Sequence, residues 1–126
     1  MSDNHELLVI DDDDEICDLL SELLGDHFKV TTCNTPNEAL THVQSHSVDI
    51  ILSDAVLNSS MSLEELIASI REKKLFMPIV VMSGHDKDHE TVQKALDNGA
   101  SGYLAKPFLN FEEIGRYLHS LLSSSK

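Results

Sequence analysis

The stretch LLVIDDDDEI (7–16) decides the fold, because a short apolar run ends in it directly at a run of acids. The consecutive apolar residues Leu7–Ile10 predict a strand that is buried on both faces of a parallel sheet. A run of like charges is usually a solvated surface, yet Asp11–Glu15 follows the strand with no residue between them. The acids therefore stand at the carboxyl end of a predicted buried strand, and the rest of the chain is interpreted from that position.

Apolar runs of the same kind recur along the chain, separated by segments with helical periodicity. The strand-like runs are Leu7–Ile10, Phe28–Thr32, Val48–Leu52, Pro78–Met82 and Gly102–Ala105. The helical segments carry apolar residues three and four positions apart, within 16–24, 39–43, 63–70, 92–96 and 114–122. Capping residues indicate helix starts at Thr35-Pro36 with Glu38, at Ser62 with Glu65 and at Asn110 with Glu113, and glycines indicate helix ends at Gly25 and Gly99.

Strands and helices alternate five times, with connections of a few residues. This alternation predicts an α/β fold with a doubly wound, five-stranded parallel sheet, helices on both faces and right-handed crossovers. We expect one domain over residues 1–122, with 123–126 as a tail or the start of a linker. In open sheets of this type, ligands bind beyond the carboxyl ends of the strands. A functional site is therefore expected at the edge where the acids stand.

The charge balance of the 126 residues limits the partners that this domain can bind. Nine Lys and Arg against 22 Asp and Glu give a formal net charge of −13, which argues against direct nucleic-acid binding and favours cation binding. The apolar runs are too short for a membrane span, and the polar amino terminus has no signal-peptide pattern. Cys17 and Cys33 have no paired spacing, which favours a reducing, cytoplasmic compartment.

Polar side chains stand at the carboxyl ends of four predicted strands. They are Asp11 and Asp12 after the first, Asp54 after the third, Ser83 after the fourth and Lys106 after the fifth. Grouped carboxylates repel one another and need protons or a cation, and Mg²⁺ prefers such oxygen ligands. A carboxylate beside that metal, with a hydroxyl and a lysine to neutralise incoming oxygens, can accept a phosphoryl group. The predicted chemistry is phosphoryl transfer onto an aspartate.

At these positions the sequence resembles the response regulator receiver domain of two-component signalling. The resemblance is carried by LLVIDDDDEI (7–16), DIILSD (49–54), PIVVMSG (78–84) and GASGYLAKPF (99–108), which span most of the chain. It implies a flavodoxin-like sheet with the strand order 2-1-3-4-5. It also implies a signalling switch that phosphorylates and dephosphorylates itself, and not an enzyme in the usual sense.

The family's roles transfer to this chain residue by residue. Asp54 matches the phosphoacceptor. Asp12 matches the direct ligand of Mg²⁺, for which Mn²⁺ can substitute, and Asp11 the residue that holds the ion through water. Val56 would offer only its backbone carbonyl to the metal.

The remaining family positions concern the phosphate and the switch. Ser83 matches the hydroxyl that moves to the aspartyl phosphate, and Lys106 the lysine that pairs with a phosphate oxygen. Tyr103 matches the aromatic residue whose rotamer follows that movement. No family role corresponds to Asp13 and Asp14, which we expect to be acids at a helix amino terminus, favoured by the helix dipole.

The segment after Asp54 departs from the family pattern. Many receivers have Met-Pro and then Asp-Gly there, whereas this chain has Ala55–Ser62 with neither Pro nor Gly. Val56 cannot orient an attacking water with its side chain, so we expect slow to moderate autodephosphorylation, unless His85 positions the water. A phosphohydrolase would commonly carry a second acid where Val56 stands, which argues against that class.

The resemblance also implies partners. A histidine kinase or phosphotransfer protein would donate the phosphoryl group, and a downstream protein or output domain would respond. The surface formed by the fourth helix, fifth strand and fifth helix would change its partner preference and offer a face for a homodimer. The alternative is a receiver fold used only for docking or dimerisation. The altered loop supports that alternative, and the intact set of site residues counts against it.

Two histidine pairs have the i, i+4 spacing that can hold Zn²⁺ on a helix, His42 with His46 and His85 with His89. Neither pair has a Cys or His nearby as a third ligand, so we expect ordinary polar side chains there. An EF-hand interpretation of the acids from Asp12 to Glu15 fails, because the alternating acids and the central glycine are missing.

Overall fold

The parallel sheet predicted from the sequence is present, with the strand order β2-β1-β3-β4-β5. The structure, a computed structural model, describes residues 5–55, 57, 61–83, 89–105 and 111–124. The strands are β1 (His5–Ile10), β2 (Phe28–Cys33), β3 (Ile50–Asp54), β4 (Ile79–Ser83) and β5 (Gly102–Ala105). The helices are α1 (Asp14–Leu24), α2 (Pro36–Ser45), α3 (Leu63–Glu72), α4 (His89–Asp97) and α5 (Phe111–Ser124).

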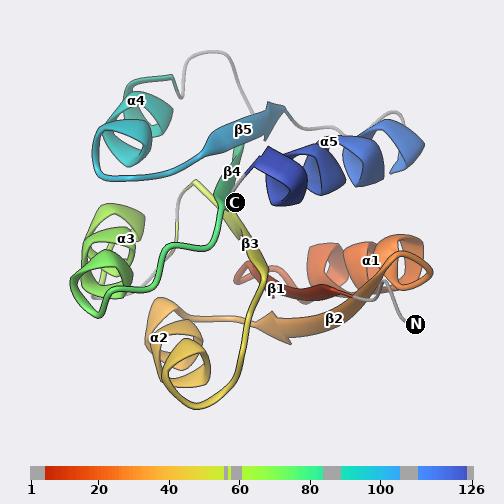
Figure 1. The fold of residues 1–126 in the computed structure, drawn as a ribbon, viewed down its shortest axis with the longest axis horizontal. Helices are drawn as coiled ribbons and strands as arrows, with labels where there is room; N and C mark the ends of the chain where they lie inside the picture. Colours follow the sequence, from red (N-terminus) through yellow and green to blue (C-terminus); the bar gives the residue numbers. More distant parts are fainter. Residues whose placement is uncertain (1–4, 56, 58–60, 84–88, 106–110, 125–126) are drawn as a thin grey trace.

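Helices cover both faces of the sheet, as the alternation predicted (Figure 1). The helices α2, α3 and α4 pack on one face, where Leu8, Ile51 and Val81 point toward them. The helices α1 and α5 cover the other face, to which Val9 and Leu52 belong. Because successive strand residues point to opposite faces, each central strand contributes to both cores. The doubly wound architecture is confirmed.

Burial distinguishes the central strands from the edge strands. Every residue of β4 is buried, and so is each residue of β1 from Leu7 on. In β2, by contrast, Lys29 and Thr32 are exposed, and in β5 Tyr103 is exposed. The expectation of strands buried on both faces is therefore wrong for β2 and β5, because each lies at an edge of the sheet and has only one neighbour.

The predicted helix starts at Thr35 and Ser62 are confirmed. The Thr35 hydroxyl accepts a hydrogen bond from the Glu38 amide at 3.1 Å, and Pro36 opens the helix. Ser62 and Glu65 form a reciprocal capping box, with bonds of 3.1 and 2.8 Å. These bonds satisfy amides that a helix leaves unpaired at its amino end. Asn110 lies outside the described residues.

The two predicted helix-end glycines differ in their backbone. Gly99 follows α4 with φ of 118°, a conformation that favours glycine. Gly25 ends α1 with φ of −65°, an ordinary helical value. There a glycine is needed for space, since a Cβ would lie 2.6 Å from the Ser21 carbonyl oxygen.

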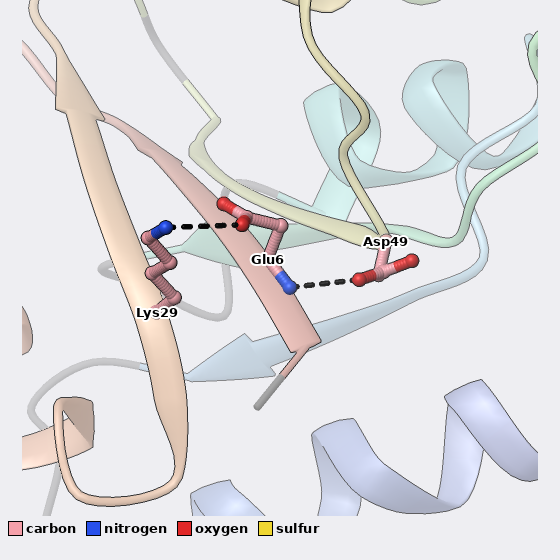
Figure 2. Close-up of polar contacts among 3 residues, drawn as sticks. All are labelled: Glu6, Lys29 and Asp49. Carbon is pink, nitrogen blue, oxygen red and sulfur yellow. Dashed lines mark hydrogen bonds and ion pairs between the residues drawn. The ribbon is translucent and has the colours of Figure 1, made fainter. Parts of the chain in front are cut away.

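A polar contact holds the amino ends of β1 and β3 together (Figure 2). The Glu6 amide donates to Asp49 Oδ2 at 2.8 Å, and the Asp49 amide donates to the Glu6 carbonyl at 2.9 Å. On the other side, the Glu6 carboxylate lies 3.8 Å from Lys29 Nζ on β2. The reciprocal bonds between Glu6 and Asp49 lie at the end of the sheet opposite to the predicted site, and they fix how β1 aligns with β3.

Replacing Gly102 by alanine is expected to destabilise the fold by about 1 to 3 kcal/mol through overpacking. A Cβ at Gly102 would overlap the Tyr117 hydroxyl on α5. Adding Tyr117→Phe should recover most of the loss, because the nearest remaining ring atom, Cζ, is 3.2 Å away. Urea unfolding measures both variants.

A matched control is Gly115→Ala in α5, where the added Cβ would meet only His27 Cδ2, at 3.8 Å. This substitution should be neutral or stabilising by about 0.5 to 1 kcal/mol, because alanine favours helix. If Gly102→Ala were as stable as the parent chain, or if Tyr117→Phe failed to rescue it, the proposed contact between β5 and α5 would be wrong.

Candidate functional site

Three carboxylates meet at the carboxyl edge of the sheet. One carboxylate oxygen each from Asp11, Asp12 and Asp54 lies within 4.8 Å of the other two. Asp11 is buried with 1% of its surface exposed, Asp54 is half-buried and Asp12 is exposed. In the described part of the chain this is the one group of three or more acidic, histidine or cysteine side chains whose ligand atoms converge. The predicted convergence of these three carboxylates is confirmed.

Strand pairing brings these residues together. Ile10, the last residue of β1, pairs with Ser53 of β3. The following residues, Asp11 and Asp54, are therefore adjacent across the two strands. The Asp11 amide continues the ladder on the other side with a bond of 3.1 Å to the Cys33 carbonyl. The two central strands thus position the acids rigidly.

The acids that follow in sequence begin helix α1. The Asp13 amide donates to Asp11 Oδ1 at 2.9 Å, and Asp13 Oδ1 accepts from the Glu15 amide at 2.9 Å. Asp13 is therefore the helix cap, and Asp14 and Glu15 lie in the first turn. Both positions suit acids because of the helix dipole. The expected helix-terminal role of Asp13 and Asp14 is confirmed.

Asn34 supports the acidic loop, and the sequence interpretation missed it. Its side-chain amide donates to the Asp11 carbonyl at 3.1 Å and to Asp14 Oδ1 at 2.8 Å. Asn34 directly follows β2, so it stands at the same edge of the sheet as the acids. That position was the available signal, since a polar residue directly after β2 stands at the same edge of the sheet as those after the other strands.

The donor set fits a hard divalent cation. Three carboxylate oxygens within 4.8 Å of one another repel when ionised, and Mg²⁺ or Mn²⁺ accepts such oxygen ligands while keeping several waters. Asp12 is exposed and Asp54 half-buried, so water and a ligand can approach from solvent. The arrangement can therefore hold a metal beside a half-buried carboxylate.

Ser83 and Tyr103 lie on one face of the neighbouring strands. Ser83 ends β4 and is 3% exposed, and the residue before it, Met82, pairs with Asp54. Tyr103 pairs with Val81, two residues before Ser83, so alternation places both side chains on the α4 side of the sheet. Tyr103 is 44% exposed. The hydroxyl therefore stands at the rim of the acidic site, with a half-exposed aromatic ring farther along the same face.

Some predicted site residues lie outside the described residues. Lys106, Val56 and His85 are among them. Their predicted roles as phosphate partner, backbone ligand and water-positioning residue stay predictions.

Cys17 lies directly beneath the acidic loop. Its thiol donates to the Asp11 carbonyl at 3.3 Å. Burial, together with the negative charge of Asp11, raises its pKa from 9.0 to about 11. Burial likewise raises the pKa of Cys33 to about 11. The cysteines belong to the cores on opposite faces of the sheet, and both are free.

The folded chain should therefore resist thiol alkylation. At a pH of about 8, a pKa near 11 in place of 9.0 lowers the thiolate fraction about a hundredfold. Because the folded pKa lies above the unfolded one, the thiols' contribution to the free energy of unfolding is complete below pH 9 and is lost as the pH rises toward 11. Iodoacetamide labelling followed by mass spectrometry measures the rate at which the two thiols are alkylated. Native labelling as fast as in urea would contradict it.

The histidine pair at the carboxyl end of α2 is a stacked aromatic pair, His42 on the helix and His46 directly after it. The His42 and His46 rings are 4.4 Å apart and nearly parallel, at 8°. Ser45 Oγ lies 2.9 Å from His46 Nδ1. Burial, with the neighbouring His46, lowers the pKa of His42. Parallel rings direct their nitrogens alongside one another and not toward a common point.

The fold and the acidic edge identify the class of protein. The family model of the response regulator receiver domain matches residues 7–119, and the chain belongs to this family. Phosphorylation-dependent switching in two-component systems is the function of the family, and its members bind Mg²⁺ in an acidic pocket.

Particular relatives agree with this assignment. The transcriptional regulatory protein KdpE of Staphylococcus aureus is 37% identical over 110 residues, covering 86% of this chain and 46% of KdpE. The transcriptional regulatory protein ZraR of Escherichia coli is 33% identical over 125 residues, covering 96% of this chain and 27% of ZraR. The chain thus spans less than half the length of these curated relatives.

Solved structures show the same fold. The chemotaxis response regulator CheY4 of Vibrio cholerae superposes with a TM-score of 0.83 at 28% identity, covering 94% of this chain and 98% of CheY4. NtrX of Brucella abortus gives a TM-score of 0.88 at 26% identity, covering 97% of this chain and 28% of NtrX. Among the described residues, no helix is long and apolar enough to cross a membrane.

Proposed function

We propose that Asp54 accepts a phosphoryl group from a phosphohistidine donor, a histidine kinase or a phosphotransfer protein. The observation that carries this proposal is the convergence of Asp11, Asp12 and Asp54 within 4.8 Å at the end of the central strands. Asp54 is half-buried at the end of β3, so its carboxylate can meet a donor from solvent while the strand fixes its backbone. A fixed nucleophile contributes to phosphoryl transfer through positioning.

The chemistry forms one bond and breaks one. A carboxylate oxygen of Asp54 attacks phosphorus as the bond from phosphorus to the donor's imidazole nitrogen breaks, and the imidazole leaves with the bonding electrons. Bound Mg²⁺ would neutralise the charge on the phosphoryl oxygens. Asp12 and Asp54 would hold it directly, Asp11 through water, and Val56 through its carbonyl. Lys106 would pair with a phosphoryl oxygen.

The switch would run from Ser83 to Tyr103. New negative charge on Asp54 would attract the Ser83 hydroxyl as a hydrogen-bond donor. Because Ser83 and Tyr103 share one face of β4 and β5, inward movement of Ser83 would open space for the half-exposed ring. The surface of α4, β5 and α5 would then favour a different partner, by population shift.

This surface would serve a downstream protein or output domain, and a homodimer is one form that the contact could take. We propose the receiver unit over residues 1–122, with 123–126 as its tail, acting in the cytoplasm. The free thiols of Cys17 and Cys33 suit a reducing compartment. The formal charge of −13 supports protein partners over direct binding to nucleic acid.

Beryllofluoride, which stands in for a phosphoryl group, tests the switch by heteronuclear NMR with Mg²⁺ present. The expected result is a set of amide shifts at Asp54 and Ala55, at Ser83 and around Tyr103. The residues of α2 and β2 away from the site should stay unchanged. If spectra with and without beryllofluoride were identical in saturating Mg²⁺, the switch would be wrong, and a docking module without switching would be favoured.

A further inference from the structure

A small hollow lies where the connection from α1 to β2 meets helix α5. Its volume is about 250 Å³, and it is lined by His27, Gly115, Arg116 and His119. His27 directly precedes β2, whereas the other three residues belong to α5, which packs beside α1 (Figure 1). The proposed phosphoryl transfer onto Asp54 uses none of these residues.

Packing holds the lining residues in place. The His27 amide donates to the Leu24 carbonyl at the end of α1 at 3.0 Å, and the His119 ring stacks on the buried Phe28 at 4.7 Å and 20°. Gly115 has no side chain, and even an added Cβ would meet His27 Cδ2 only at 3.8 Å. The glycine therefore leaves room between the connection and the helix.

The three side chains that line the hollow are all nitrogen donors. Arg116 carries a permanently charged guanidinium with five N–H groups, and each imidazole donates at least one N–H whether it is neutral or protonated. The rings of His27 and His119 stand edge to face, with centroids 6.4 Å apart and planes at 86°. In the described part of the chain, neither Arg116 nor His27 forms an ion pair with an acid. The hollow thus presents donors and positive charge, which suits an anion and not a metal ion.

We propose that this hollow binds a small phosphate-type oxyanion, inorganic phosphate or a phosphate monoester, with Arg116 as its anchor. A guanidinium fork binds two phosphate oxygens at once, and the remaining oxygens would accept from the imidazoles of His27 and His119. A carboxylate has only two oxygens, so the guanidinium fork alone would satisfy it. A phosphate therefore uses more of the donors that the hollow provides.

The size of the hollow and the range of its charges also fit this ligand. A volume of about 250 Å³ is below the roughly 300 to 1,000 Å³ of pockets for drug-sized ligands, which indicates a small ligand. The net charge of −13 repels anions at long range, but salt screens exposed charges beyond about 8 Å. The donors that line the hollow therefore dominate the affinity. Asp26, next to His27, is exposed to water.

Heteronuclear NMR with inorganic phosphate in EDTA tests the site, since no Mg²⁺ is then bound at the carboxylates. At constant ionic strength, set with chloride, the amides of the lining residues should shift until they saturate. Arg116→Gln at an exposed position should lower the affinity by about tenfold or more, because the charged donor fork is lost. His119→Phe keeps a ring to stack on Phe28 and should also lower the affinity, because its N–H donor is lost.

The matched control is Lys94→Gln on α4, which removes the same positive charge from another exposed position and should keep the parent affinity. The spectra themselves show whether each variant is folded. Loss of affinity in Arg116→Gln and His119→Phe, with Lys94→Gln unchanged, supports the site. The proposal is overturned if the lining amides of the parent chain do not shift, if either lining variant keeps the parent affinity, or if Lys94→Gln loses as much as Arg116→Gln.

Two further titrants define the ligand. Acetate should bind more weakly than inorganic phosphate, and equal affinity for the two would overturn the proposal of a phosphate site. Glycerol 3-phosphate distinguishes the two sources of the phosphate group. Tighter binding than that of inorganic phosphate supports a monoester as the ligand, and weaker binding supports the free ion.

Discussion

Replacing Asp54 by asparagine is expected to abolish phosphoryl acceptance altogether. The amide has nearly the shape of the carboxylate, so β3 should keep its place, but the uncharged amide is a far weaker nucleophile. It also removes one of the three charges that converge at the sheet edge. Incubation with acetyl phosphate and Mg²⁺, followed by intact mass measurement, should show no gain of a phosphoryl group.

The matched control for this substitution is Asp49→Asn on the segment that leads into the same strand. Asp49 contacts the Glu6 amide at the opposite end of the sheet (Figure 2). Asp49→Asn should therefore accept a phosphoryl group as the parent chain does. Phosphorylation of Asp54→Asn at the parent level would mean that another residue is the acceptor.

Replacing Asp12 by asparagine is expected to weaken Mg²⁺ binding by at least about tenfold. A charged ligand contact contributes about 1.5 to 3 kcal/mol, and Asp12 supplies one of the three converging carboxylates. Because Asp12 is exposed, the substitution should leave the fold intact. Isothermal titration with Mg²⁺ measures the affinity, and the rate of phosphorylation should fall with it at limiting Mg²⁺.

Asp13→Asn provides a control that removes the same charge one residue away. Asp13 caps α1 by accepting from the Glu15 amide, and asparagine caps a helix equally well. Its Mg²⁺ affinity should stay near that of the parent chain. Equal losses of Mg²⁺ affinity in Asp12→Asn and Asp13→Asn would mean that the affinity depends only on the total negative charge of the loop.

Much of the fold could be predicted from hydrophobic periodicity. Every strand-like run became a strand and every helical segment a helix, because burial on a sheet and on one helix face imposes different periods. The observed boundaries of the elements differ from the predicted ones where polar contacts intervene. β3 begins at Ile50 and not at Val48, since Asp49 uses its side chain to bind the Glu6 amide.

The convergence of Asp11, Asp12 and Asp54 could be predicted because parallel strands end at a common edge. What could not be predicted depends on the alignment of distant elements. Asn34 reaches Asp11 only because β2 lies beside β1. Arg71 of α3 donates to the carbonyls of Leu75, Met77 and Gly99, which links the α3–β4 and α4–β5 connections. No spacing in the sequence signals such contacts.

The central claim is Mg²⁺-dependent phosphorylation of Asp54, and the most direct test is intact mass spectrometry of the chain with acetyl phosphate. In Mg²⁺ the expected result is a gain of one phosphoryl group, which peptide mapping assigns to Asp54. In EDTA, or in Asp54→Asn, no gain is predicted. A chain that gains no phosphoryl group in saturating Mg²⁺, or gains it equally in EDTA, would contradict the account.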